Sequence, residues 1–134
     1  MCGIYAYIGN KPAAPSLIEG IKKLEYRGYD SVGISTIENG TDIVIHKVVG
    51  NTKKLKSNLS RESLDGTIGI AHTRWATHGK ISKANAHPHI SNNNDVAISH
   101  NGIIENYLDL KQELLNDNFT FKSETDSEII SHLI

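Results

Sequence analysis

The chain begins Met1-Cys2-Gly3-Ile4-Tyr5-Ala6-Tyr7-Ile8-Gly9, and the only cysteine of the sequence is its second residue. The alternating aliphatic and aromatic residues after Cys2 predict a β-strand with both faces covered. Removal of Met1 would leave Cys2 with both a thiol and a free α-amine, and an N-terminal amine can act as the base that activates its own side chain. Position alone favours the alternative, a small buried apolar residue. The remaining sequence decides between these two interpretations.

The composition is that of one globular domain or part of one, with 134 residues and a formal net charge of −1. This charge gives no basic surface of the kind expected for nucleic-acid binding. No apolar run reaches membrane-spanning length, and the N-terminus lacks the basic segment and apolar stretch of a secretory signal. A single cysteine excludes an intramolecular disulfide and favours a reducing, cytoplasmic location.

Hydrophobic periodicity and turn residues predict helices mixed with hairpin-linked strands. Helices are expected over residues 15–26, 51–59 and 106–116, and strands over 31–37, 41–48, 67–72, 96–100 and 119–121. Asn39-Gly40 is a strong hairpin signal, and Thr125-Asp126-Ser127-Glu128 has the capping-box pattern that opens a final helix. Residues 74–95 are expected to form a long loop, and such loops are usually functional. Because the chain stops within the final helix, we expect a truncated domain.

Four segments place polar residues at strand ends or helix starts, namely 25–31, 71–79, 99–106 and the capping box. Each has a purely structural interpretation: Asn101-Gly102 is typical of a turn, Asp126 of a helix-dipole partner, and Arg74 of a solvated surface charge. Histidines at positions 72, 78, 87, 89 and 100 suggest a metal site. Their spacing matches no common zinc pattern, so hydrogen-bonded structural histidines are the better interpretation and no metal is expected.

Six ordered motifs together resemble the class II glutamine amidotransferase domain, from Cys2 to the last residue. They are Met1-Cys2-Gly3-Ile4, Glu25-Tyr-Arg-Gly-Tyr-Asp-Ser31, Ala71-His-Thr-Arg-Trp-Ala-Thr-His-Gly79, Asn85-Ala-His-Pro-His89, His100-Asn-Gly-Ile-Ile-Glu-Asn106 and Ser123-Glu-Thr-Asp126. The resemblance implies an α+β fold, the four-layer αββα sandwich of N-terminal-nucleophile hydrolases, incomplete at the C-terminus. Residues 2–134 would then be the N-terminal portion of the glutaminase domain, with a sugar isomerase domain absent from this chain.

The resemblance also assigns roles to individual residues. Cys2 would attack the side-chain amide of glutamine with its own α-amine as base, while the Asn101 amide and the Gly102 backbone N–H would form the oxyanion hole. Residues expected to bind or cover glutamine are Arg74, Thr77 and His78 at the α-carboxylate, Asp126 at the α-ammonium, and Trp75 over the site. Arg27 is expected to support the strand that carries Cys2. The resemblance implies no cofactor and no metal.

The implied activity is hydrolysis of glutamine to glutamate and ammonia. Trp75, Thr77 and His78 favour the branch of the family that uses this ammonia to convert fructose 6-phosphate to glucosamine 6-phosphate. The alternatives are the phosphoribosyl branch, a non-enzymatic glutamine-binding remnant, and an inactive fragment. Expected partners are glutamine and the isomerase domain, with a homodimer through that domain as an option and with no nucleic acid or membrane.

Overall fold

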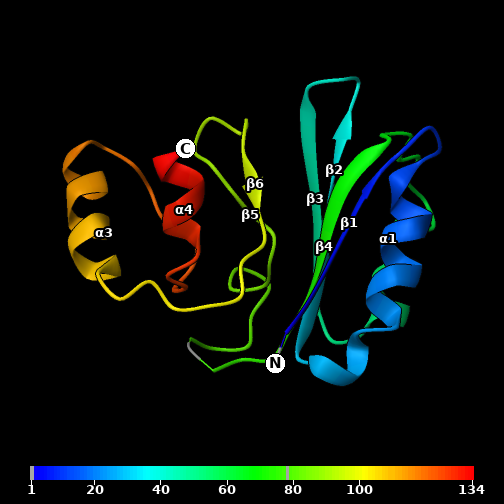
Figure 1. Cartoon of the computed structure of the whole chain (residues 1–134), viewed down its shortest axis with the longest axis horizontal. Helices are drawn as coiled ribbons and strands as arrows, with labels where there is room; N and C mark the ends of the chain where they lie inside the picture. Colours follow the sequence, from blue (N-terminus) through cyan, green and yellow to red (C-terminus); the bar gives the residue numbers. More distant parts are fainter. Residues whose placement is uncertain (1, 78) are drawn as a thin grey trace.

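The computed structural model describes residues 2–77 and 79–134. Its elements are β1 (Gly3–Ile8), α1 (Ala13–Lys22), the 3₁₀ helix η1 (Glu25–Arg27), β2 (Ser31–Glu38), β3 (Asp42–Val49), α2 (Thr52–Leu59), β4 (Ile68–Arg74), β5 (His89–Ile90), β6 (Ala97–Ile98), α3 (Tyr107–Asn116) and α4 (Glu128–Leu133). β1–β4 form one sheet, sheet A, and β5 and β6 form a second, sheet B. Figure 1 shows α1 outside sheet A, and α3 and α4 outside sheet B. This succession of helix, sheet, sheet and helix confirms the predicted αββα arrangement.

Sheet A is antiparallel, with the strand order β1-β4-β2-β3. Its register sets Ser31, the first residue of β2, opposite Arg74, the last residue of β4. β1 also begins beside the end of β4. The register therefore brings Cys2 and Asp30, which immediately precede β1 and β2, to the same end of the sheet as Arg74.

One face of sheet A packs against α1 and α2 and is mainly apolar. Leu17 and Ile21 of α1, Ile34 of β2, Leu55 of α2 and Ala71 of β4 are all 0% exposed. Successive strand residues point to opposite faces of a sheet, so this core uses only alternate strand positions. The other positions of the same strands face sheet B and are free to carry polar groups.

The predicted hairpin between β2 and β3 is confirmed. Asn39 and Gly40 both have positive φ angles, 51° and 82°. Positive φ at both central positions is typical of a type I′ turn, and Asn-Gly adopts this conformation at low cost. The turn is closed by the Thr41 N–H, which donates to the Glu38 carbonyl at 3.1 Å, and residues 39–41 connect the eight-residue strands in the register that pairs Glu38 with Asp42.

The predicted coverage of both faces of β1 is wrong. β1 is the edge strand of sheet A, and its face toward α1 includes Tyr5, which lies against Gly20. Ile4 and Ile8 point to the other face and are 41% and 78% exposed. The two-residue strands of sheet B leave this face open, which strand periodicity alone does not reveal.

The predicted boundaries also differ in several places, and the range 74–95, expected to be one loop, includes Arg74 of β4 and the two-residue strand β5. The helix expected over 15–26 is divided into α1 and η1, and the strand expected over 96–100 shortens to Ala97–Ile98. Residues 119–121 form irregular chain instead of a strand, and the Phe121 ring packs edge-on against His132 of α4, with ring centroids 5.0 Å apart. Among the described residues, none of the helices combines the length and apolar character needed to cross a bilayer.

The predicted capping box is wrong. α4 begins at Glu128, and the Glu128 carboxylate accepts hydrogen bonds from the backbone N–H groups of Lys122 and Ser123, at 2.8 and 2.7 Å. The Thr125 hydroxyl instead contacts His89 Nε2 at 2.8 Å. The Glu128 side chain therefore connects α4 to the preceding loop, and the Thr125 side chain connects that loop to sheet B. Neither side chain caps the N-terminus of α4.

Candidate active site

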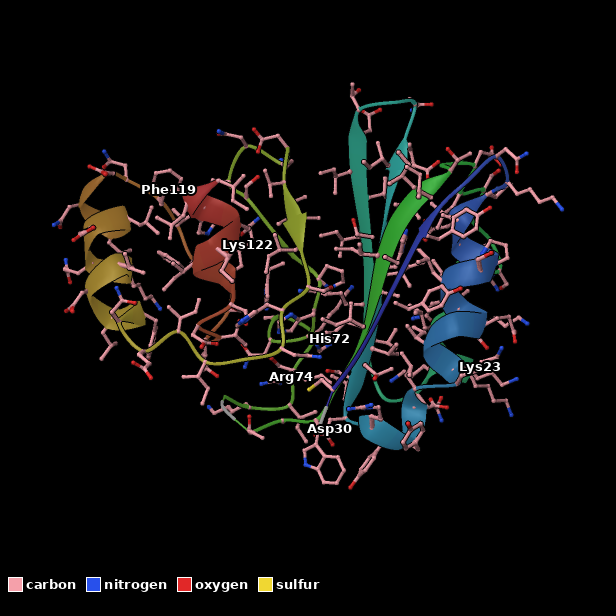
Figure 2. The ribbon with its side chains drawn as sticks, in the orientation of Figure 1. Lys23, Asp30, His72, Arg74, Phe119 and Lys122 are labelled. Carbon is pink, nitrogen blue, oxygen red and sulfur yellow. The ribbon has the colours of Figure 1, made fainter. Side chains whose placement is uncertain are left out.

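A pocket of about 410 Å³ opens at the end of sheet A where Cys2 and Arg74 meet. This volume lies within the usual range of ligand pockets, roughly 300–1,000 Å³. Figure 2 shows His72 and Arg74 on the side of sheet A that faces sheet B. The pocket is lined by Cys2, Arg27, His72, Arg74, Trp75, Thr77, His87, His100, Asn101, Gly102, Ile103, Thr125, Asp126 and Ser127.

The thiol of Cys2 is held at the junction of β1 and the segment after β4. The Trp75 backbone N–H donates to Cys2 Sγ at 3.1 Å. The next residue, Gly3, donates its N–H to Thr73 Oγ1 at 3.1 Å. Cys2 is half-buried and free, so its sulfur has a fixed position and access to the pocket.

The Asn101 side chain contacts both Cys2, which immediately precedes β1, and His72 of β4. Its Nδ2 donates to the backbone carbonyl of Cys2 at 3.1 Å, and its Oδ1 lies 2.9 Å from His72 Nε2. A Cβ atom at Gly102 would lie 2.8 Å from Nε2 of His100. Glycine at position 102 therefore leaves the backbone close to the pocket and to the His100 ring.

Arg74 is buried, with 5% of its surface exposed. Its Nη1 donates to the Lys80 carbonyl at 3.2 Å, and Asp30 Oδ2 accepts from the Ala76 N–H at 2.6 Å. Burial lowers the pKa of the Arg74 guanidinium, while Cys2 and Asp30 raise it, and a guanidinium remains charged in proteins. The pocket therefore contains a fixed positive charge, contrary to the alternative of a solvated surface arginine.

Trp75 and Thr77 belong to the segment that follows Arg74 along the pocket rim. Trp75 is 43% exposed, and its ring lies 5.2 Å from that of Tyr29 at an angle of 60°. His78, predicted to bind glutamine beside Thr77, lies outside the described residues. The rings of Tyr29 and Trp75 are therefore in contact although more than forty positions separate these residues in the sequence.

The carboxylate of Asp126 lies on the opposite wall of the pocket from sheet A, in the loop before α4. Asp126 Oδ2 accepts from the Ile104 backbone N–H at 2.7 Å, and the Ser127 hydroxyl contacts Oδ1 at 3.4 Å. Asp126 is half-buried and precedes the first residue of α4 by two positions. It is therefore positioned by loop contacts and not by the first turn of a helix.

Three histidines form a buried stack beneath the pocket. The His72 and His87 rings are parallel at 4.2 Å, and the His87 and His89 rings meet edge-on at 4.4 Å. Burial is the largest cause that lowers the pKa of His72 to about 4 and of His89 to about 3. Burial also lowers the pKa of His87, with further contributions from the other two histidines. These rings are therefore neutral at pH 7.

Each imidazole in the stack has a hydrogen-bond partner. His72 contacts Asn101, His87 Nδ1 accepts from the His100 N–H at 3.4 Å, and His89 contacts Thr125. These contacts agree with hydrogen-bonded structural roles for His72, His87 and His89, whereas His78, which belongs to the same prediction, lies outside the described residues. Within residues 2–77 and 79–134, no cluster of three histidine, cysteine or acidic side chains has metal-binding geometry.

Sequence reasoning missed two residues that hold the loop around the pocket. Asn85 Nδ2 donates to the Lys80 carbonyl at 2.9 Å and to Glu124 Oε2 at 3.0 Å. The Glu124 N–H returns a bond to Asn85 Oδ1 at 2.8 Å. Both residues lie within the motifs of the resemblance, and their pairing across 39 positions has no signal in local sequence.

The predicted site residues converge in this pocket. Cys2, Arg27, Arg74, Trp75, Thr77, Asn101, Gly102 and Asp126 all line it. Structural convergence supports the predicted set, although it does not assign a role to any member.

The glutamine amidotransferase domain family matches residues 57–134, more than half of the chain. The glutamine–fructose-6-phosphate aminotransferase (isomerizing) of Caldanaerobacter subterraneus subsp. tengcongensis is 52% identical over 134 residues, covering 100% of this chain and 22% of the relative. The corresponding protein of Methanosarcina mazei is 54% identical over 136 aligned positions, with the same coverage of 100% and 22%. The chain thus spans about a fifth of the length of these curated relatives.

Solved structures of the same fold cover 99% of the chain. Glutamine phosphoribosylpyrophosphate amidotransferase from B. subtilis, complexed with ADP and GMP, superposes with a TM-score of 0.81 at 28% identity, over 29% of its own chain. The allosteric regulatory enzyme of purine biosynthesis superposes with a TM-score of 0.82 at 29% identity, also over 29% of its chain. The chain therefore belongs to the glutamine amidotransferase domain family and has the fold of its N-terminal-nucleophile members.

Proposed function

We propose that this chain hydrolyses the side-chain amide of glutamine with Cys2 as the nucleophile. The observation that carries the proposal is that the Cys2 thiol, the Asn101 amide, the Arg74 guanidinium and the Asp126 carboxylate line one pocket. A guanidinium suits the α-carboxylate of glutamine because it donates two parallel hydrogen bonds. A carboxylate suits the α-ammonium group. The substrate would therefore be held at its amino-acid end while its amide reaches Cys2.

In the proposed reaction, removal of Met1 frees the α-amine of Cys2, Cys2 Sγ attacks the amide carbon, and the α-amine takes the thiol proton. The negative charge that develops on the amide oxygen is stabilised by Asn101 Nδ2 and the Gly102 backbone N–H. The amine then returns the proton to the leaving nitrogen, and ammonia departs from a glutamyl thioester. Water hydrolyses the thioester and releases glutamate, which restores the thiol.

The remaining site residues have supporting roles in the proposal. Thr77 and His78 assist Arg74 at the α-carboxylate, Trp75 covers the bound substrate, and Arg27 supports the strand that carries Cys2. The chemistry uses only these protein groups and a free α-amine. The proposal therefore includes no cofactor and no metal.

We extend the proposal to a longer enzyme in which residues 2–134 are the N-terminal portion of the glutaminase domain. Its ammonia would convert fructose 6-phosphate to glucosamine 6-phosphate in a sugar isomerase domain. Support comes from identities of 52% and 54% to glutamine–fructose-6-phosphate aminotransferases, against 28% to the phosphoribosylpyrophosphate amidotransferase. The proposed enzyme is cytoplasmic, dimerises through the isomerase domain, and binds neither nucleic acid nor membrane.

The decisive experiment compares the chain with its Cys2→Ala variant. Ammonia release from glutamine should fall by at least about 10⁴-fold, as expected when a covalent nucleophile is removed. Glutamine binding, measured by calorimetry, should persist because Arg74 and Asp126 are unchanged. A glutamine analogue with an electrophilic carbon in place of the amide should label Cys2, detected as a mass increase on its peptide.

A second variant, with a short uncleaved extension before Cys2, tests whether the α-amine of Cys2 acts as the base. It keeps the thiol and should lose most of the activity, so equal activity would contradict the proposed base. Glutamine binding without ammonia release by the unmodified chain would instead support the binding remnant. Absence of both binding and a cooperative melting transition would support the inactive fragment.

A further inference from the structure

We infer that His72 is a positioning residue that fixes the orientation of the Asn101 side-chain amide at the nucleophile. The inference rests on the proposed function, because it concerns the donor proposed to stabilise the oxyanion. His72 is on β4 and 1% exposed, and Figure 2 shows it beside the site, close to Arg74. Its Nε2 lies 2.9 Å from Asn101 Oδ1.

The contact with Cys2 determines which way the amide faces. The Cys2 backbone carbonyl can only accept a hydrogen bond, and it lies 3.1 Å from the Asn101 amide. The edge of the amide that faces Cys2 must therefore be Nδ2, the donor. The edge that faces His72 is then Oδ1, an acceptor, so His72 must supply a proton from Nε2.

The other side of the His72 ring agrees with this assignment. His72 Nδ1 is buried and makes no hydrogen bond within 3.5 Å to the described residues, although the His100 backbone lies close enough to raise the pKa of the ring. A proton on Nδ1 would create a buried, unpaired N–H and would leave two lone pairs facing each other at Nε2 and Oδ1. The tautomer with its proton on Nε2 avoids both penalties.

Two features keep the imidazole neutral and in place. The ring lies parallel to that of His87 at 4.2 Å, which restricts its rotation. Burial lowers the pKa of His72 to about 4, so the ring carries a single proton at neutral pH. A single proton on Nε2 selects one amide orientation, in which Asn101 Nδ2 faces Cys2.

A double-mutant cycle with His72→Phe and Asn101→Ala tests the inference. Phenylalanine keeps a ring against His87 but removes the donor, so kcat for ammonia release should fall roughly tenfold, with the KM for glutamine nearly unchanged. This is part of the roughly 10²–10³-fold effect expected for loss of an oxyanion donor. In the Asn101→Ala background, His72→Phe should have no further effect on kcat.

His72→Gln is the conservative variant, because its side-chain amide can donate from about the position of Nε2. It should restore most of the kcat lost in His72→Phe. Equal losses from His72→Phe with and without Asn101 would show a purely structural role and overturn the inference. Failure of the glutamine variant to recover activity would also count against it.

Nitrogen NMR of the labelled chain tests the same contact without turnover. We expect the ¹⁵N shifts of His72 to show a protonated Nε2 and an unprotonated Nδ1 at pH 7 and pH 6. Protonation at Nδ1 would overturn the inference even in an active enzyme. If the unmodified chain releases no ammonia, the proposed function fails, and the NMR result still decides whether His72 orients Asn101.

Discussion

The two faces of sheet A have opposite chemistry although they share the same strands. On the face toward α1 and α2, Leu17, Ile21, Ile34 and Leu55 form a continuous apolar core. On the face toward sheet B, the buried side chains include Ser31, Ser35, His72 and Arg74. Burial of apolar area stabilises the first face without directional contacts, whereas the second depends on hydrogen bonds with defined partners.

This difference separates stability from chemistry within one small sheet. Apolar packing tolerates conservative changes of shape, so the helix-covered face can anchor the strands with few specific requirements. The polar face positions charges and hydrogen-bond donors, and a buried polar atom without a partner costs stability there. Ser31 Oγ and His72 Nδ1 are two such atoms among the described residues. The groups proposed to act in catalysis lie on the side of the polar face, while apolar packing on the opposite face stabilises the strands.

Acidification should disturb the polar face most strongly. His72, His87 and His89 have folded-state pKa values below the ordinary value, so the unfolded chain binds more protons below about pH 6.5. Their contribution to stability is therefore complete above that pH and is lost as pH falls toward about 4 for His72 and about 3 for His89. At pH 5 the loss should be about 2 kcal/mol for each histidine.

Urea denaturation at pH 7 and pH 5 measures this effect. His89→Gln, which keeps an amide near the Thr125 hydroxyl, should remove about one third of the pH-dependent loss. An unfolding free energy that stays constant between pH 7 and pH 5 would show that these rings are not buried as neutral groups.

A cavity on the helix-covered face should have the next largest effect. Ile34 is 0% exposed, and Ile34→Ala should lower the free energy of unfolding by about 2–5 kcal/mol because it removes apolar contacts and leaves a void. Ile34→Val is the matched control, with an expected loss of about 0.5–1.5 kcal/mol. Chemical denaturation at pH 7 gives both values, and similar losses from both variants would contradict the close packing of this core.

Removal of one buried charge on the sheet B side should have the smallest effect of the three. Glu128 is 2% exposed and accepts from Lys122 N, Ser123 N and Ser123 Oγ. Glu128→Gln replaces one acceptor by a donor, so the unfolding free energy should fall by about 1.5–3 kcal/mol. Glu124→Gln is the matched control, because Glu124 is exposed and also accepts a backbone N–H, that of Lys80.

Glu124→Gln should therefore destabilise the chain less than Glu128→Gln does. The comparison is made by thermal melting at pH 7, where the histidines of the stack are neutral. A larger loss from Glu124→Gln would mean that the loop around Lys80, and not the buried carboxylate, holds this side of the molecule together.

Local sequence predicted the parts of the fold that depend on neighbouring residues. Asn39-Gly40 specifies its turn because few residues adopt positive φ at both central positions. The stripe of Leu17, Ile18 and Ile21 specifies the buried face of α1 through helical periodicity. The capping-box prediction was wrong because the Glu128 carboxylate accepts hydrogen bonds from the backbone N–H groups of Lys122 and Ser123. Both residues lie outside the four-residue pattern at positions 125–128.

The sequence by itself determined that Cys2 is the only thiol, that Asn39-Gly40 forms a turn between two strands, and which motifs place the chain in its family. Only the tertiary structure decided which side chains meet. Strand periodicity assigns His72 and Arg74 to one face, but it does not say that Asn101, 29 positions after His72, will lie 2.9 Å away. Such contacts depend on strand register and on loops closing over the sheet, both of which are set by packing of the whole chain.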